Sequence, residues 1–342
     1  MRTPALLILL AAGAGAVATA QPPVTLANAD LQTSAASPAA AVRSTGADVA
    51  WIAWSEPMVA GDRDVCCFSG DGRSRHGRGC PLEGRTGFTM SDDRPAARPP
   101  FERELLVLVR AQRGSATEVR AFSGDCPIDA GKRRLVWLDN VDGDESIRFL
   151  RVLVTGRTLD GALPALALHR QAEAGQVLEE LAARPGDARE DAIFWLGEAR
   201  GRSGLEALRR LLAARPDSAA RKEIAFAFAQ SEQQEALDDL IAMAHHDPSE
   251  ETRGEALFWL GQHGGERAEG ELLRTIQQDA AIELRKKAVF ALSQLESGRS
   301  TPLLLGVLKS KVPAEIRREA LFWLGQSDDP KAQEALEAVL LR

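Results

Sequence analysis

Four cysteines are the residues of this chain whose chemistry is easiest to specify. Cys66 and Cys67 are adjacent, and Cys80 and Cys126 follow at wider spacing. In an exported protein, an even number of cysteines is typical of disulfides. Adjacent residues of a strand point to opposite faces, so we predict that Cys66 and Cys67 each bond to one of Cys80 and Cys126. Which of them takes which partner stays open.

Two other uses of the same sulfurs compete with this prediction. Zinc would be held by Cys66, Cys67, His76 and Cys80, since the spacing of His76 and Cys80 is found in zinc sites. The adjacent cysteines differ from the usual C-x2-C turn, however, and oxidation competes with metal binding. A redox-active pair of cysteines typically has a C-x-x-C motif, which the chain lacks. We therefore predict disulfides and no metal site.

The remaining polar residues form no pattern typical of catalysis. The other histidines are His169, His245, His246 and His263, and none is followed by Glu. A Walker A sequence, a G-x-G-x-x-G fingerprint after a strand and a G-x-S-x-G elbow are all absent. The acidic run Asp139–Glu145 lacks the Glu that closes a calcium loop, so we interpret it as a turn with a helix cap. We predict neither catalytic residues nor a cofactor.

The elements that must position these residues follow from an internal repeat. The word EALFWLGQ occurs at Glu255–Gln262 and again at Glu319–Gln326, and related words recur every 32 residues. An arginine heads each copy, and a phenylalanine follows five residues later. The five phenylalanines are Phe194, Phe226, Phe258, Phe290 and Phe322. A fixed period in this range predicts a stacked array.

Each unit of the array is predicted to be a pair of helices. Its first half is dense in Ala, Leu, Phe and Trp, and its second half has apolar residues at helical spacing. Polar connectors such as His246–Glu251 supply caps and prolines between units. Neither helix buries its apolar face alone, so neighbouring pairs must share one core. With a shorter pair over Gly161–Arg184, this gives an α-solenoid of about six hairpins over residues 157–342.

The unit resembles a short HEAT repeat of the bacterial type, similar to the repeats of phycobilisome lyase subunits. The matching features are the Asp247-Pro248 turn before the first helix, Arg253 at its start and the A-L-x-x-L-G run. The resemblance implies an α-solenoid fold, but many functions share such folds. Deoxyhypusine hydroxylase also resembles these arrays and holds two irons with His-Glu pairs, which this chain lacks. We therefore carry over neither that activity nor the bilin chemistry of the lyases.

The composition changes near residue 155, which predicts a second domain. Residues 1–20 combine an apolar run with an Ala18-Thr19-Ala20 ending, typical of a secretory signal peptide. The mature chain is therefore expected outside the cytoplasm, in a bacterial periplasm, without a stable membrane span. Residues 21–47 are rich in Ala, Ser, Pro and Thr and predict a flexible linker.

Residues 48–156 predict a small β-rich domain that contains the cysteines and is assigned to no family. Together with the array, it makes the expected fold class α+β. Its strands are expected at Val49–Trp54, Arg63–Phe68, Glu104–Gln112, Glu118–Ser123 and Arg134–Leu138. A long loop is expected over 70–100, and Glu145–Val154 predicts a helix that bridges to the array.

The residue after each phenylalanine alternates strictly between bulky and small. It is Trp195, Ala227, Trp259, Ala291 and Trp323 in turn. One interpretation is packing, in which large faces small across each junction. The other is a row of partner-binding anchors, because Trp is enriched at interface hot spots. Sequence alone does not separate the two, and we keep Trp195, Trp259 and Trp323 as partner-binding candidates.

These observations favour a non-enzymatic protein-interaction scaffold that binds an unidentified protein partner. A net charge of −7 and the lack of a basic stripe argue against nucleic acid. One alternative is an exported sensor whose cysteine domain responds to redox state or metal. Another is an enzyme related to HEAT-type lyases or hydroxylases, which the missing His-Glu pairs disfavour.

Overall fold

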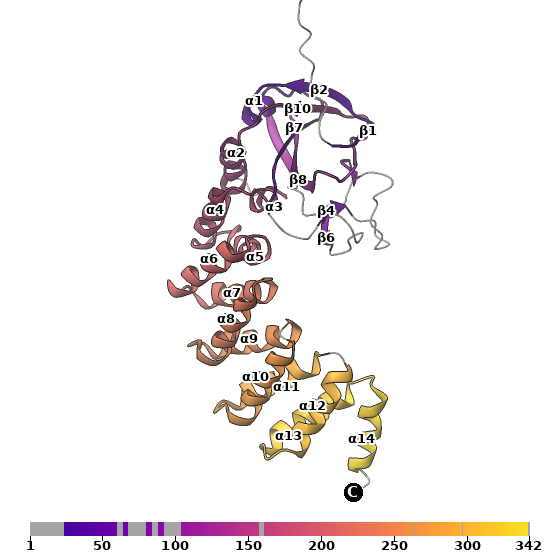
Figure 1. Ribbon diagram of the computed structural model, residues 1–342, viewed down its shortest axis with the longest axis vertical. Helices are drawn as coiled ribbons and strands as arrows, with labels where there is room; N and C mark the ends of the chain where they lie inside the picture. The colour runs from indigo at the N-terminus through magenta and orange to yellow at the C-terminus, as the bar shows by residue number, and fades with distance from the viewer. Residues whose placement is uncertain are drawn as a thin grey trace, which may run out of the picture.

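The computed structural model describes residues 24–59, 64–67, 80–83, 88–91, 104–156, 161–263, 265–295 and 297–340. A β-rich part lies at one end, and a curved stack of helices runs from it to the C-terminal end (Figure 1). The predicted order of a β-rich region and an α-solenoid is confirmed. The predicted signal peptide lies outside the described residues. Among the helices that are described, none is long and apolar enough to cross a membrane.

A five-stranded mixed sheet organises the β-rich part. In spatial order its strands are β2 (Asp30–Ser34), β10 (Arg134–Leu138), β3 (Ala50–Pro57), β7 (Glu104–Gln112) and β8 (Ser115–Ser123). The first three run parallel, and β3, β7 and β8 are antiparallel. The β7–β8 hairpin turns at Arg113 and Gly114, whose φ angles of 52° and 74° fit the type I′ turn that matches strand twist.

The central strands β3 and β7 are buried on both faces of the sheet, which explains why their sequences are nearly continuous apolar runs. Val107 and Val109 of β7 point to the side of the helices, whereas Leu106 and Leu108 point to the other side. The helix side is covered by α1 (Pro38–Arg43), α2 (Gly143–Gly156) and α3 (Ala162–Ala167). The other side packs on a layer with two small sheets, made of β1 (Leu26–Ala27), β9 (Ile128–Asp129) and β5 (Cys80–Pro81), and of β4 (Asp64–Cys67) and β6 (Phe88–Ser91).

The predicted flexible linker over residues 21–47 is wrong for most of its length. β1, β2 and α1 lie within it, and Ala41 and Val42 of α1 are buried. β2 pairs in parallel with β10, which lies far along the chain. An edge strand held by backbone bonds to a distant partner needs few apolar residues of its own, so composition did not reveal it. The predicted loop over 70–100 likewise contains β5 and β6.

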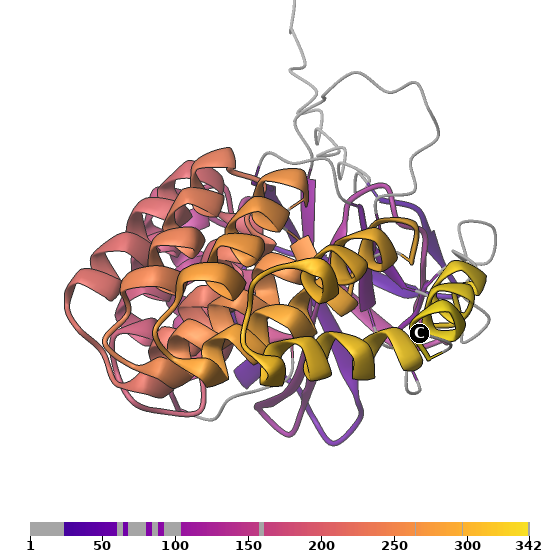
Figure 2. The same cartoon turned by 90° about the horizontal axis from the view of Figure 1, so that it is seen from below.

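The α-solenoid consists, within the described residues, of six helical pairs, and in each pair we name the first helix A and the second B. The A helices are α3, α5 (Arg189–Ala199), α7 (Ser218–Gln230), α9 (Glu250–His263), α11 (Ile282–Ser293) and α13 (Ala314–Gly325). The B helices are α4 (Ala172–Ala182), α6 (Gly201–Ala213), α8 (Gln234–His246), α10 (Gly265–Gln278), α12 (Ser297–Lys309) and α14 (Pro330–Leu340). Seen from below, successive pairs lie one behind the other (Figure 2).

The arginine at the start of each unit fastens the turn between units. Arg253 donates to the carbonyl of Asp247 at 2.8 Å, and Arg285 donates to the carbonyl of Ile276 at 2.6 Å. Arg317 donates to the carbonyl of Val312 in the same way. These carbonyls belong to the ends of helices and the turns that follow, where backbone acceptors lack partners within the helix. The arginine column is therefore structural.

The two layers of the solenoid are held together differently. Successive B helices are bridged by long side chains, for example Arg210 to Glu179 at 2.7 Å and Arg209 to Asp239 at 2.8 Å. Successive A helices touch more directly, through small residues. The array curves accordingly: in Figure 1, α5 and α11 lie on the inner side of the curve, and α6 and α10 lie on the outer side.

A buried chain of hydrogen bonds joins the sheet to the solenoid. The indole N–H of Trp54 donates to Ser146 Oγ at 2.8 Å, and Ser146 Oγ lies 2.8 Å from His169 Nε2. His169 Nδ1 lies 2.6 Å from the carbonyl oxygen of Ala165, so Nδ1 carries the proton and Nε2 accepts from the serine. Burial lowers the pKa of His169 to about 4, which keeps the ring neutral. Ser146 and His169 are both fully buried, so this pair serves the fold and is closed to a substrate.

Replacing Glu56 by Gln should change how stability depends on pH. Burial, with the charge of nearby Asp142, raises the pKa of Glu56 from 4.5 to about 7. A raised pKa contributes stability that is complete below the unfolded value of 4.5 and is lost as the pH rises through 7. In urea titrations, the difference in the free energy of unfolding between the wild type and E56Q should therefore fall as the pH rises from 4.5 to about 7. The titration of His169 is the same in both proteins and does not affect this difference. A difference that does not change with pH would contradict the raised pKa of Glu56.

Candidate interaction surface

The phenylalanine of each unit lies on the outward side of its A helix. Phe194, Phe226, Phe258 and Phe290 are partly exposed, and Phe322 is 54% exposed. Residues three before and four after each phenylalanine share its side of the helix, because both spacings are close to one turn. We call this surface the A face: the five phenylalanines with the residues at these two flanking positions.

The aromatic rings of the A face form one continuous column. The rings of Phe194 and Phe226 are stacked, with their centroids 5.8 Å apart. The centroids of the Phe226 and Trp259 rings lie 4.5 Å apart. The same order recurs in the next two units, from Phe258 through Phe290 at 6.0 Å to Trp323 at 4.8 Å. Phe258 also meets the edge of Trp259 at 4.8 Å, which joins the two halves. The column therefore runs without a break from α5 to α13.

Glycines explain why Trp and Ala alternate in the column. A Cβ on Gly197 would lie 2.3 Å from the carbonyl oxygen of Ala227, and one on Gly261 would lie 2.6 Å from that of Ala291. At these two junctions the A helices approach closely, and only Ala fits at the position after the phenylalanine. At the other two junctions Ala229 and Ser293 replace the glycine, and Trp259 and Trp323 fill the wider gap. The alternation thus follows the packing interpretation.

The structure separates the three tryptophans that were predicted to contact a partner. Trp195 is only 5% exposed and packs in the core, so its prediction as a partner contact is wrong. Its position faces the preceding unit, where α3 packs against α5. Trp259 and Trp323 stay partly exposed, and for them a partner contact remains a prediction. Trp323 Nε1 donates to Glu319 at 2.8 Å, whereas Trp259 Nε1 is buried without a partner among the described atoms.

Polar residues flank the phenylalanine column on both sides. One turn before it stand Asp191, Glu223, Glu255, Lys287 and Glu319, and one turn after it stand Glu198, Gln230, Gln262, Gln294 and Gln326. Burial and the neighbouring carboxylates of Glu190 and Glu255 raise the pKa of Glu223. The carboxylates of α5, α7 and α9 therefore lie near enough to repel one another. Neither row was predicted from the sequence, although both lie at spacings of three and four residues from each phenylalanine.

The histidines do not gather into a site. His245 Nε2 contacts Glu271 at 2.9 Å, and the ring of His263 stacks on Trp259 at 6.0 Å. Over the described part of the chain, no group of three or more His, Cys, Asp or Glu side chains could hold a metal ion. His76, the histidine of the zinc alternative, lies outside the described residues.

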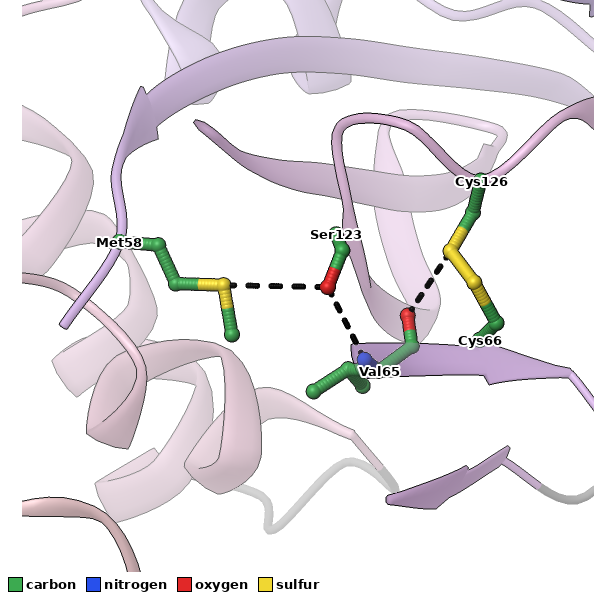
Figure 3. The surroundings of a disulfide bond; sticks show 5 residues. All are labelled: Met58, Val65, Cys66, Ser123 and Cys126. Carbon is green, nitrogen blue, oxygen red and sulfur yellow. Dashed lines mark hydrogen bonds between the residues drawn. A yellow bond between two sulfur atoms is a disulfide. The ribbon is translucent and has the colours of Figure 1, made fainter. Parts of the chain in front are cut away.

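One disulfide joins β4 to the segment after β8, between Cys66 and Cys126, with their Cα atoms 5.8 Å apart (Figure 3). Of the two partners left open for Cys66, the structure has Cys126. Cys80 is also disulfide-bonded, and the side chain of Cys67 lies outside the described residues. Cys126 is fully buried and Cys66 nearly so, and Ser123 Oγ accepts from the amide of Val65 at 2.9 Å beside them. The bond thus lies inside the second core, by which we mean the apolar cluster on the side of the sheet away from the helices, around Leu106 and Leu108.

Comparison with known proteins identifies the repeat. Residues 175–261 and 237–321 match the family described as HEAT repeats, and residues 316–342 match the PBS lyase HEAT-like repeat. The solenoid is therefore similar to HEAT repeats from residue 175 to residue 342. A solved structure titled "Crystal structure of Cex1p" is similar at 17% identity and a TM-score of 0.23, over 60% of this chain and 38% of that one. This chain thus spans well under half of that protein, and the likeness carries no functional argument. The comparison with curated proteins finds no match.

Proposed function

We propose that the HEAT repeats of this chain form a non-enzymatic scaffold, outside the cytoplasm, that binds an extended protein partner along the A face. The observation that carries the proposal is the unbroken ring column across five A helices, in which all five phenylalanines are at least partly exposed. Stacked repeats create long binding surfaces of this kind. Aromatic side chains offer large contact areas that lose little conformational freedom on binding.

The β-rich part supports this role as a cap. The first helical pair would otherwise expose an apolar face, since terminal repeats of a solenoid need a polar or covered end. α3 packs on β8, and a single apolar core continues from Ile52 of the sheet to Ala332 of α14. The cap therefore fixes the start of the A face rigidly.

The sensor alternative receives less support from the disulfide. A redox sensor uses cysteines that solvent reaches, and exposed or strained disulfides are the labile ones. Cys126 is 0% exposed and Cys66 is 7% exposed. Both burial values favour a structural bond, so we propose a scaffold and not a redox switch.

Site-specific photocrosslinking tests the scaffold proposal. A photoreactive phenylalanine analogue is placed at Phe258 on the A face, or at Glu266 on α10 as a control on the outer layer. In the cell that makes the protein, we expect a defined crosslinked species from position 258 only, in the exported fraction and without residues 1–20. Crosslinks solely from position 266, or none at all, would overturn the scaffold assignment. A crosslinked species in the cytoplasm would overturn the proposed location.

A further inference from the structure

The carboxylates of the A face differ from those of the B helices in their pairing. On the outer layer, acids are neutralised by arginines of the neighbouring unit: Glu179 by Arg210, Glu235 by Arg202, Asp238 by Arg267, Asp239 by Arg209 and Glu269 by Arg299. Asp191, Glu223 and Glu255 of the A face, and Glu190 next to Asp191, form no ion pair with any described residue. These carboxylates of α5, α7 and α9 therefore lack a direct ion-pair partner, and Arg189 and Lys222 offset the charge of Glu223 only in part.

The flanking charges are mixed farther along the same face. On α11 the residue three before the phenylalanine is Lys287, and on α13 it is Glu319, with Arg318 next to it in the chain. The two cations that act on Glu223 form their ion pairs with other residues, since Lys222 binds Glu251 and Arg189 binds Asp217 at 2.6 Å. The phenylalanine column runs through both halves. The A face is therefore apolar along its middle, and acids flank it on three successive A helices only over α5, α7 and α9.

We propose that the A face over α5, α7 and α9 binds an extended protein segment whose lysine or arginine side chains alternate with aromatic or aliphatic ones. This inference rests on the proposed function and specifies the partner. The cations would pair with Asp191, Glu223 and Glu255, whose carboxylates lie beside the ring column. The apolar side chains would pack against Phe194, Phe226 and Phe258.

The amide row supplies the remaining chemistry. Gln230 and Gln262 stand one turn beyond the phenylalanines, and each amide offers both a donor and an acceptor. Such groups suit the backbone of an extended segment, whose N–H and C=O groups need partners when they leave water. Four steps of about 9 Å between neighbouring A helices give about 36 Å, the length of about eleven extended residues.

Peptide binding tests the inference directly. The probe is a labelled peptide of about eleven residues with Lys and Phe alternating in one half and Ser and Phe in the other. Its anisotropy is measured with the full chain, with E223Q/E255Q, and with E206Q/E266Q as a matched control on the outer layer. We expect binding that salt weakens, about tenfold weaker for E223Q/E255Q and unchanged for the control. A peptide with Glu in place of each Lys should not bind.

Three outcomes would overturn the inference: equal binding by the Lys and Glu peptides, equal loss in both variants, or no binding of the Lys peptide. None of them decides the scaffold proposal, because the crosslink from position 258 is measured with the natural partner. A crosslinked partner that binds E223Q/E255Q as tightly as the wild type would leave the scaffold standing and remove the cationic partner. Circular dichroism of both variants checks that the fold is kept.

Discussion

Replacing Gly197 or Gly261 by Ala should lower the free energy of unfolding by about 3 kcal/mol each, although a single methyl group is added to a helix. The new Cβ would lie 2.3 Å or 2.6 Å from a carbonyl oxygen of the next A helix. The obstacle is backbone, so no side chain can turn away, and α5 and α7, or α9 and α11, must move apart. Helix propensity alone predicts the opposite, a gain of up to about 1 kcal/mol.

Gly325 provides the matched control for this prediction. It occupies the same position of its unit, in α13, but a Cβ there meets nothing within 4 Å. Gly325→Ala should therefore leave stability unchanged or raise it by up to about 1 kcal/mol. The three variants are compared by urea denaturation followed by circular dichroism. Equal effects at all three sites would show that the close approach at the two junctions does not limit the packing.

The sequence predicted the solenoid well because its determinants are local. Each helix has its own apolar spacing, and the period of 32 residues repeats the same contacts five times. The strands β7 and β10 could be predicted for a related reason, since a strand buried on both faces is apolar at nearly every position. Elements that depend on distant partners were missed. β2 pairs with β10, and β5 pairs with β9. The residues next to β2 and β5 in the chain give no sign of these pairings.

The candidate site shows the same division between local and distant information. The phenylalanine column was visible as a marker of the repeat. Whether a neighbouring Trp is buried depends on the unit before it. Trp195 packs after α3 and is covered, whereas Trp259 and Trp323 pack after α7 and α11 and stay partly exposed. The continuous core between the sheet and the solenoid could not be predicted either, because its residues in the sheet lie outside the repeat.

Removal of the disulfide between Cys66 and Cys126 should have the largest effect on the β-rich part. The bond closes a loop of 60 residues, for which chain entropy alone predicts a contribution of about 4 kcal/mol. The effect should spread beyond β4, because Cys66 and Cys126 pack with Trp51 and Leu108 in the second core. The double variant C66S/C126S should therefore unfold at a clearly lower urea concentration than the oxidised wild type.

Two comparisons decide what that loss means. Reduced wild type should unfold no later than C66S/C126S, because reductant also opens the disulfide of Cys80. A loss below about 1 kcal/mol would contradict a structural role, since native disulfides of small domains contribute about 2–5 kcal/mol. The crosslink from position 258 should persist in C66S/C126S below its unfolding transition, because the A face lies in the solenoid and is built without cysteine. If oxidation state instead switched that crosslink on and off in the folded protein, the cysteine layer would be acting on the partner site, and the sensor hypothesis would replace the scaffold.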